Sequence, residues 1–174
     1  MRAQLHELSL PGAMLARGFW LYVWEVTDGS GRQWLYVGRT GDSSSPNAQS
    51  PFSRLSQHLG GNRRGNALRR NLARVGVNPD TCRSFELSCY GPVLPECEDM
   101  ERHRPSRDIM AGLEKGLRDA LHAAGYNLLN EVKSRHPIDQ CIRRQVRQTE
   151  CSLEEAESQS PGLTRVARGY PGNR

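Results

Sequence analysis

Two short runs of aromatic and β-branched residues, separated by a glycine-rich turn, most constrain how this chain can fold. The runs span residues 20–27 and 33–39, and residues 28–31 between them are Asp-Gly-Ser-Gly. Runs of this composition are typical of β-strands, and Asp, Gly and Ser supply the backbone conformations that tight turns require. The sequence therefore predicts a hairpin of two adjacent antiparallel strands.

Helical patterns and a third strand are expected after the hairpin. Ser50 followed by Pro51 is typical of a helix start, and this helix should end at Gly60 and Gly61. The further elements we expect are a basic helix at 66–75, a strand at 84–90 that ends at Gly91-Pro92, and a long helix from about 106 to 124. This order predicts an α+β fold, a small three-stranded antiparallel sheet flanked by helices.

The chain length of 174 residues suits one folded unit with extensions. Beyond residue 130 the pattern weakens: apolar residues at 138, 142 and 146 lie beside arginines, and the chain from Ser158 onward is rich in Pro, Gly and Arg. We expect an N-terminal extension at 1–17, a folded domain at 18–133, a basic amphipathic helical extension at 134–157 and a disordered tail at 158–174.

The composition favours a polyanionic partner. There are 24 basic and 19 acidic residues, a net charge of +5. No apolar run approaches the roughly 18 residues of a membrane helix and no signal peptide is evident, so we expect a cytoplasmic protein without membrane association. Five cysteines without CxxC spacing argue against a disulfide framework or a zinc ribbon. Cys89, Cys97 and His103 lack a fourth ligand at finger-like spacing.

The hairpin should place two phenols side by side. Alternation groups Tyr22 with Trp24 on the first strand and Tyr36 with Trp34 on the second. In a tight hairpin centred on Gly29, Tyr22 and Tyr36 would be direct cross-strand partners on one face. Aromatic cross-strand pairs are also common sheet stabilisers, so the pair alone indicates either packing or chemistry.

The helix after Pro51 carries two groups suited to phosphate chemistry. Phe52, Leu55 and Leu59 form its expected buried stripe, and Arg54 and His58, four residues apart, share an adjacent face. A guanidinium binds phosphate oxygens in bidentate fashion, and an imidazole can transfer a proton near neutral pH. The alternative is two solvated polar residues on a short helix.

The long helix carries a carboxylate at the margin of its apolar stripe. Glu114 lies just outside that stripe, whereas Asp119 projects to the opposite, solvent side. A partly desolvated carboxylate needs a partner, for which a hard cation such as Mg²⁺ is suited. The alternative partner is a nearby arginine.

A one-sided basic segment lies between the hairpin and the third strand. No Asp or Glu occurs from residue 43 to residue 79. Such a strip suits sequence-independent phosphate contacts, although a solvated helix face is the alternative. The candidate nucleic-acid-binding residues are Arg39, Arg63, Arg64, Arg69, Arg70 and Arg74, with Arg54 nearer the chemistry.

In chain order, these residues resemble the signature of the GIY-YIG nuclease superfamily: Leu21-Tyr22-Val23, Tyr36-Val37-Gly38, Arg54, His58, Glu114 and Asn130. The resemblance covers roughly residues 19–130, and Leu-Tyr-Val stands where the family has Gly-Ile-Tyr. It implies that the 18–133 domain is a compact nuclease domain that hydrolyses phosphodiester bonds with one divalent ion, Mg²⁺ or Mn²⁺.

The resemblance also implies a role for each matching residue. Glu114 would be the metal ligand, and Arg54 would brace the scissile phosphate. A tyrosine, helped by His58, would orient or deprotonate the attacking water. Asn130, or Asn127 in its place, would hold the site together by hydrogen bonding. The implied catalytic set is Tyr22, Tyr36, Arg54, His58, Glu114 and Asn130.

The sequence therefore predicts a Mg²⁺-dependent DNA endonuclease, as a monomer or a homodimer. A non-catalytic nucleic-acid-binding module on the same fold is the alternative, and a plain interaction protein is a third. RNA is the alternative substrate, and the residues do not distinguish restriction, repair and mobile-element roles.

Overall fold

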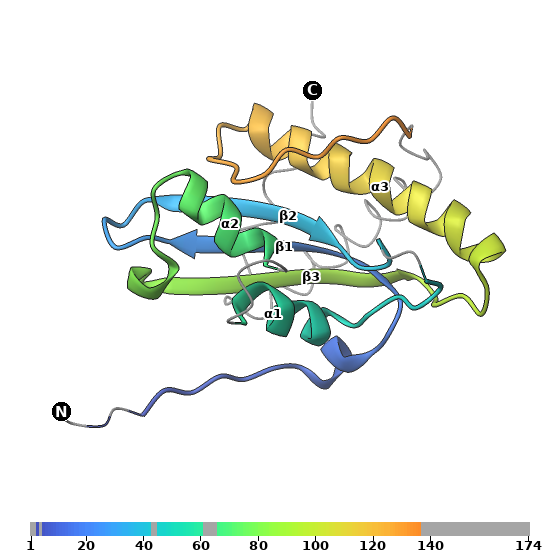
Figure 1. The fold of residues 1–174 in the computed structure, drawn as a ribbon, viewed down its shortest axis with the longest axis horizontal. Helices are drawn as coiled ribbons and strands as arrows, with labels where there is room; N and C mark the ends of the chain where they lie inside the picture. The colour runs from blue at the N-terminus through green and yellow to red at the C-terminus, as the bar shows by residue number, and fades with distance from the viewer. Residues whose placement is uncertain (1–2, 4, 43–44, 61–65, 137–174) are drawn as a thin grey trace, which may run out of the picture.

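The computed structural model describes residues 3, 5–42, 45–60 and 66–136. It confirms the predicted α+β fold with a small three-stranded antiparallel sheet (Figure 1). In chain order, the elements are the 3₁₀ helix η1 (Gly12–Leu15), β1 (Phe19–Thr27), β2 (Gln33–Arg39), α1 (Pro51–Leu59), α2 (Ala67–Arg74), the 3₁₀ helix η2 (Pro79–Thr81), β3 (Ser84–Leu94) and α3 (Met100–Ala123).

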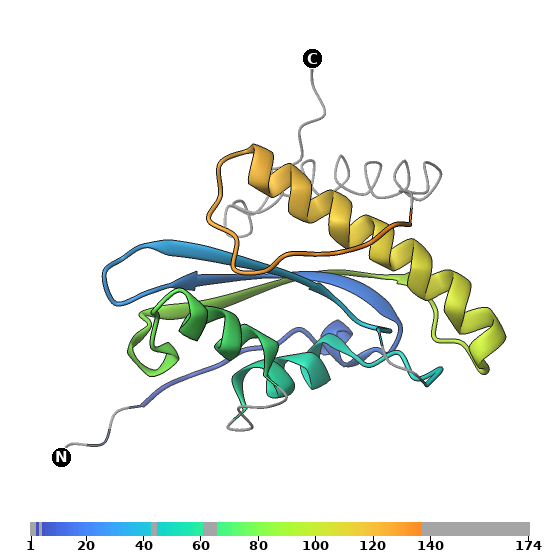
Figure 2. The ribbon, with the colours of Figure 1, turned by 45° about the horizontal axis from the view of Figure 1, so that its top comes forward.

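The sheet lies between two layers of helices. β1 is the central strand, with β2 and β3 antiparallel on either side. Helices α1 and α2 cover one face and α3 covers the other, which is clearest in Figure 2. Leu68 and Leu72 of α2 pack on the aromatic face of the sheet, whereas Leu121 of α3 packs on Val37 and its neighbours on the opposite face. Apolar burial on both faces holds the three layers together.

The hairpin register differs from the predicted one. Tyr22 pairs with Gly38 and Trp24 pairs with Tyr36, so the predicted direct pairing of Tyr22 with Tyr36 is wrong. The two tyrosines still share one face as diagonal neighbours, because the shift is an even number of residues. A Cβ on Gly38 would lie 2.4 Å from Cζ of Tyr22, so the missing side chain is what lets the Tyr22 ring lie across β2.

The turn residues explain this register. Asp28 N–H donates to the Arg32 carbonyl at 3.0 Å, and Asp28 Oδ1 accepts from the backbone N–H groups of Ser30 (2.9 Å) and Arg32 (3.0 Å). These bonds close a turn centred on Ser30, one residue later than the predicted centre at Gly29. A side-chain carboxylate that binds nearby backbone N–H groups is a common way to set such a turn.

Two helices begin and end much as the sequence predicts. Ser50 Oγ accepts from the N–H of Ser53 at 3.3 Å and caps α1. Asn66 caps α2 in the same way, and Gly76, at φ +75°, follows its last turn.

The third strand and the long helix are longer than predicted. β3 continues past Gly91-Pro92 to Leu94, because a register shift along β1 brings Leu94 opposite Phe19. Helix α3 begins at Met100 because Asp99 caps it, with Oδ1 accepting from the N–H of Arg102 at 2.9 Å.

The predicted buried stripe of α1 is also wrong at its first position. Phe52 is 42% exposed, whereas Pro51 and His58 are buried. The buried residues of α1 begin one residue earlier, at Pro51, and include His58, while Leu55 and Leu59 pack against the aromatic core as predicted. The imidazole of His58 can lie on this buried face because the hydroxyl of Tyr22, on the sheet, hydrogen-bonds to it.

Among the described residues, no helix is long and apolar enough to cross a membrane. Residues 137–174, which include most of the predicted helical extension and all of the predicted tail, lie outside the described part of the chain, as do Arg63 and Arg64.

Candidate active site

A buried hydrogen bond joins the first predicted tyrosine to the predicted histidine. The hydroxyl of Tyr22 lies 2.8 Å from Nε2 of His58, and both side chains are buried. The His58 ring also contacts the rings of Trp24 and Tyr36, with centroids 6.4 and 5.2 Å away. The imidazole of His58 on α1 therefore packs against the aromatic face of the sheet.

The Tyr22–His58 pair is neutral. Burial raises the pKa of Tyr22 above its ordinary value of 10. Burial, with help from the nearby Arg54 guanidinium, lowers the pKa of His58 to about 4. Transfer of the Tyr22 proton to His58 is therefore unfavourable, because the pKa of the donor is raised and the pKa of the acceptor is lowered. Among the described residues, no group hydrogen-bonds to the buried Nδ1 of His58.

Tyr36 occupies a different environment, at the wall of a pocket of about 460 Å³. Burial and the nearby Glu114 carboxylate raise its pKa to about 12, so its hydroxyl is protonated at neutral pH. The pocket is lined by Tyr36, Asn71, Arg74, Glu114, Asn130, Glu131, Val132 and Lys133. Three of the six predicted catalytic residues thus share one cavity.

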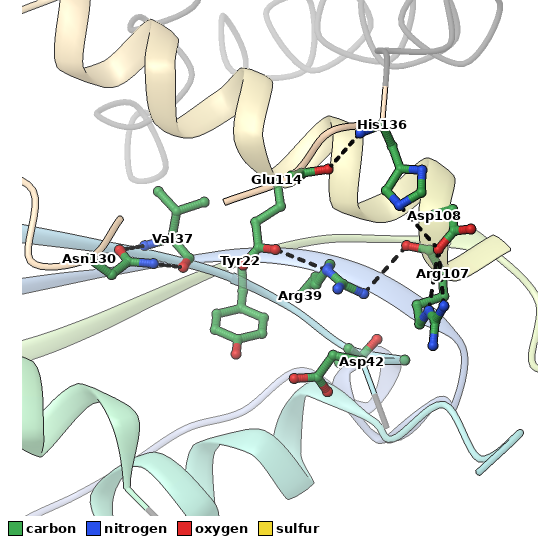
Figure 3. Close-up of polar contacts among 12 residues, drawn as sticks. Tyr22, Val37, Arg39, Asp42, Arg107, Asp108, Glu114, Asn130 and His136 are labelled. Carbon is green, nitrogen blue, oxygen red and sulfur yellow. Dashed lines mark hydrogen bonds and ion pairs between the residues drawn. The ribbon is translucent and has the colours of Figure 1, made fainter. Parts of the chain in front are cut away.

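Glu114 reaches this pocket from α3, on the opposite face of the sheet. Its Oε2 accepts from Nε of Arg39 at 2.9 Å, and both side chains are 15% exposed (Figure 3). Burial raises the pKa of Glu114, although Arg39 and Arg54 oppose the shift. The salt bridge to an arginine, one of the two partners that the sequence allows, is therefore present.

Arg54 lies near both tyrosines, since its charge lowers the pKa values of Tyr22 and Tyr36. Its guanidinium forms an ion pair with Asp42, and Nη2 also donates to the Arg39 carbonyl at 3.4 Å. It lowers the pKa values of Tyr36 and Glu114, which shows that its charge acts on both. Among the described residues, its buried Nε has no hydrogen-bond partner.

Asn130 binds the backbone of β2 rather than another side chain. Its Oδ1 accepts from Val37 N–H at 3.1 Å and its Nδ2 donates to the Val37 carbonyl at 2.8 Å (Figure 3). Leu129 N–H also donates to the Leu35 carbonyl at 2.8 Å. The segment after α3 therefore covers the outer edge of β2, as Figure 2 shows. Its alternative, Asn127, donates to the Gln33 carbonyl farther along the strand.

The position of β2 explains how these groups meet. β2 is an outer strand of the sheet, so side chains from both helical layers can reach past it. Tyr36 and the α2 residues approach from one face and Glu114 from the other, and residues 130–133 complete the pocket. The predicted set is thus brought together in two connected parts, the Tyr22–His58 pair and the pocket, with Arg54 near both.

The basic strip is partly neutralised by the two carboxylates that flank it in the sequence. Asp42 pairs with Arg54, and Asp80 pairs with Arg69 at 2.8 Å. Arg70 lies near enough to lower the pKa of Tyr36. The position of these two aspartates, just outside the acid-free segment, is the sequence signal that could have identified them as partners.

Among the described residues, a metal ion would find few protein ligands. No group of three His, Cys, Asp or Glu side chains that could hold a metal ion occurs in this part of the chain. His103, a candidate ligand in the sequence together with Cys89 and Cys97, is buried and hydrogen-bonds to the Gly41 carbonyl at 3.0 Å. Glu114 bonds Arg39 through Oε2, and no described residue hydrogen-bonds to its Oε1. The Oε1 of Glu114, in a polar pocket that Glu131 also lines, fits a largely hydrated Mg²⁺, which binds through one or two carboxylates plus substrate phosphate oxygens.

Comparisons with protein families, with curated proteins and with solved structures give no match for this chain. The resemblance to GIY-YIG nucleases therefore remains a prediction from the residues themselves.

Proposed function

We propose that this protein is a Mg²⁺-dependent endonuclease that hydrolyses phosphodiester bonds in DNA. The observation that carries the proposal is that Tyr36 and Glu114 line one polar pocket at the edge of β2, with Arg54 close enough to lower the pKa values of both. These groups come from three separate elements: the hydroxyl of Tyr36 and the carboxylate of Glu114 are in the pocket lining, and the guanidinium of Arg54 lies near both. Hydrolysis of an anionic diester needs this combination of charge neutralisation and water orientation.

In this proposal, Arg54 binds the scissile phosphate after its guanidinium leaves Asp42, because a phosphodiester is a competing bidentate anion. Tyr36 orients the attacking water through its hydroxyl at the pocket wall. His58 accepts the released proton at Nδ1, the ring nitrogen that Tyr22 does not contact, while Nε2–H donates to the Tyr22 hydroxyl. Its pKa of about 4 makes it a weak base in the free protein, but the negative charge of a bound diester nearby would raise that pKa.

Tyr22 acts as a positioning residue for His58 through their 2.8 Å hydrogen bond. Asn130 acts at the backbone, because its two bonds to Val37 keep β2 and Tyr36 in place at the pocket. Both roles are indirect, and neither residue needs to touch the diester.

The residue that would hold the Mg²⁺ ion is Glu114. When bound, the ion would supply positive charge to the reacting phosphate oxygens and lower the pKa of a bound water. The Arg39 guanidinium would then share or release the carboxylate that it now binds at 2.9 Å.

Substitution of Glu114 tests the proposal directly. We expect Glu114→Gln to lower Mg²⁺-dependent cleavage of duplex, branched or single-stranded DNA by about 100-fold or more, since it removes the charge that holds the ion. Glu131→Gln is the matched control, because Glu131 lines the same pocket and is not assigned to the ion. The proposal fails if the wild type cleaves none of these substrates with Mg²⁺ or Mn²⁺, or if Glu114→Gln cleaves as fast as Glu131→Gln. Cleavage of RNA alone would reassign the substrate.

One observation favours the second candidate, a non-catalytic nucleic-acid-binding module. Arg39 already neutralises Glu114, so the pocket is balanced without a metal ion. This candidate predicts salt-sensitive DNA binding that needs no metal and is unchanged by Glu114→Gln. Measuring DNA affinity in EDTA beside the cleavage rates separates the two.

A further inference from the structure

The pocket at the edge of β2 contains more polar groups than hydrolysis of a diester requires. Besides Tyr36 and Glu114, its lining includes Asn71, Arg74 and Lys133, which none of the catalytic roles above uses. We infer that this pocket binds one nucleotide unit of the substrate strand, with its phosphate on Arg74 and Lys133 and its base or sugar against Asn71 and Tyr36. The choice of a nucleotide rests on the proposed function, whereas the pocket and its polar groups do not.

Arg74 is held in place at the pocket. It lies in the last turn of α2, and its Nη2 donates to the Leu129 carbonyl at 2.6 Å. This is the one hydrogen bond that its guanidinium makes to a described residue. The remaining N–H groups of the planar fork are available to an anion, and a fork that is already positioned loses little freedom on binding.

Lys133 provides a second cation on another wall. It lies in the segment that follows Asn130, is exposed, and makes no ion pair with any described residue. Glu131 lies in the same wall and is likewise unpaired among the described residues. Since Arg74 comes from α2 and Lys133 from the segment after α3, the pocket presents two cations from separate elements. One phosphate could accept hydrogen bonds from both.

Asn71 presents a hydrogen-bond acceptor of known orientation. Its Nδ2 donates to the Ala67 carbonyl at 2.9 Å. A carbonyl needs a donor, so this bond identifies the nitrogen and leaves Oδ1 as the acceptor of the amide. The Tyr36 hydroxyl, protonated because its pKa is about 12, can donate or accept. Donors and acceptors together suit the edge of a base or the hydroxyl of a sugar.

The size of the cavity favours a whole nucleotide over a phosphate alone. A volume of about 460 Å³ falls within the range of roughly 300 to 1,000 Å³ typical of small-molecule sites. Such a pocket next to the scissile phosphate would hold the substrate strand in register, and it would require that strand to be locally unpaired or at an end.

Nucleotide binding without metal or cleavage tests this inference. The full chain in EDTA would be titrated by calorimetry with deoxythymidine 5′-monophosphate, and separately with inorganic phosphate. We expect Arg74→Gln with Lys133→Gln to weaken nucleotide binding by about tenfold or more, since two charge-assisted contacts are lost. The matched double variant is Arg104→Gln with Lys115→Gln, which removes the same charge from α3 outside the pocket, and we expect it to bind as the wild type does.

Three results would overturn the inference: no nucleotide binding by the wild type at millimolar concentration, equal weakening in the two double variants, or inorganic phosphate binding as tightly as the nucleotide. The proposed function is tested separately, because Glu114-dependent cleavage without nucleotide binding would contradict this inference alone. Nucleotide binding without any cleavage would instead contradict the nuclease proposal alone.

Discussion

Two tyrosines on the same face of one hairpin occupy opposite kinds of environment. Tyr22 lies across Gly38 and bonds to His58, so its hydroxyl is fully committed inside the protein. Tyr36, its diagonal neighbour, lies at the wall of a polar pocket together with Glu114. The comparison shows that two tyrosines of one hairpin face can differ in exposure to a ligand: Tyr22 bonds to the imidazole of His58 inside the protein, and Tyr36 lines the pocket.

The largest effect on stability is expected at Gly38, whose missing side chain lets the Tyr22 ring lie across β2. Gly38→Ala would place a Cβ 2.4 Å from the Tyr22 ring, which is buried and cannot move away freely. We expect a loss of about 3 kcal/mol or more in the free energy of unfolding, measured by urea denaturation. Gly12→Ala is the control, because no atom lies within 4 Å of the added Cβ. Equal stability of the two variants would contradict the close packing of the Tyr22 ring on Gly38 of β2.

Burial of His58 predicts a dependence of stability on pH. Its folded pKa of about 4 lies below the ordinary value of 6.5, so the stabilisation is present above pH 6.5 and is lost as the pH falls toward 4. The expected loss is about 3 kcal/mol in the free energy of unfolding. His58→Gln should remove this part of the pH dependence, while His122→Gln, at an exposed position of α3, should retain it. Identical pH profiles in the two variants would show that His58 is not buried as a neutral ring.

Removing the Tyr22 hydroxyl should affect stability more than it affects substrate binding. Tyr22→Phe leaves Nε2 of His58, like its Nδ1, without a hydrogen-bond partner. We expect a loss of about 1 to 3 kcal/mol in the free energy of unfolding. The exposed Tyr126→Phe is the control and should change stability by less than about 0.5 kcal/mol. A stable Tyr22→Phe variant with strongly weakened DNA binding would reverse the roles assigned to the two tyrosines.

The smallest effect concerns the ion pair that occupies Arg54 in the free protein. Asp42→Asn would free the guanidinium and remove a negative charge near the proposed phosphate site, so DNA should bind about threefold tighter. Asp119→Asn, which makes the same charge change on α3, should leave affinity nearly unchanged. Fluorescence anisotropy at two salt concentrations measures both. Equal affinities for the two variants would exclude Asp42 as a competitor for Arg54.

The parts of the structure that depend on local sequence were predictable. Strand alternation placed Tyr22 and Tyr36 on one face, and Ser50 followed by Pro51 marked a helix start, because these patterns depend on residues a few positions apart. The predicted hairpin register was wrong, since the register depends on which backbone N–H groups Asp28 binds. A turn centre one residue later changes the cross-strand partner of every residue by two positions.

The contacts that define the candidate site are long-range and could not be derived from spacing. Arg39 and Glu114 are 75 positions apart, and Arg74 and Leu129 are 55 apart. The sequence could show that Glu114 needed a partner, but only the packing of α3 against β2 selects Arg39. The pocket itself arises because residues 130–133 close the edge of β2, which no local pattern predicts.

The most direct test of the central claim is the single-turnover rate of DNA cleavage with Mg²⁺ by Tyr36→Phe, beside the wild type and Tyr22→Phe. The account predicts that Tyr36→Phe folds normally and cleaves about 100-fold or more slowly than the wild type, since it loses the hydroxyl that orients water, whereas Tyr22→Phe loses less. A Tyr36→Phe variant that cleaves at the wild-type rate would contradict the assignment of the pocket as the active site.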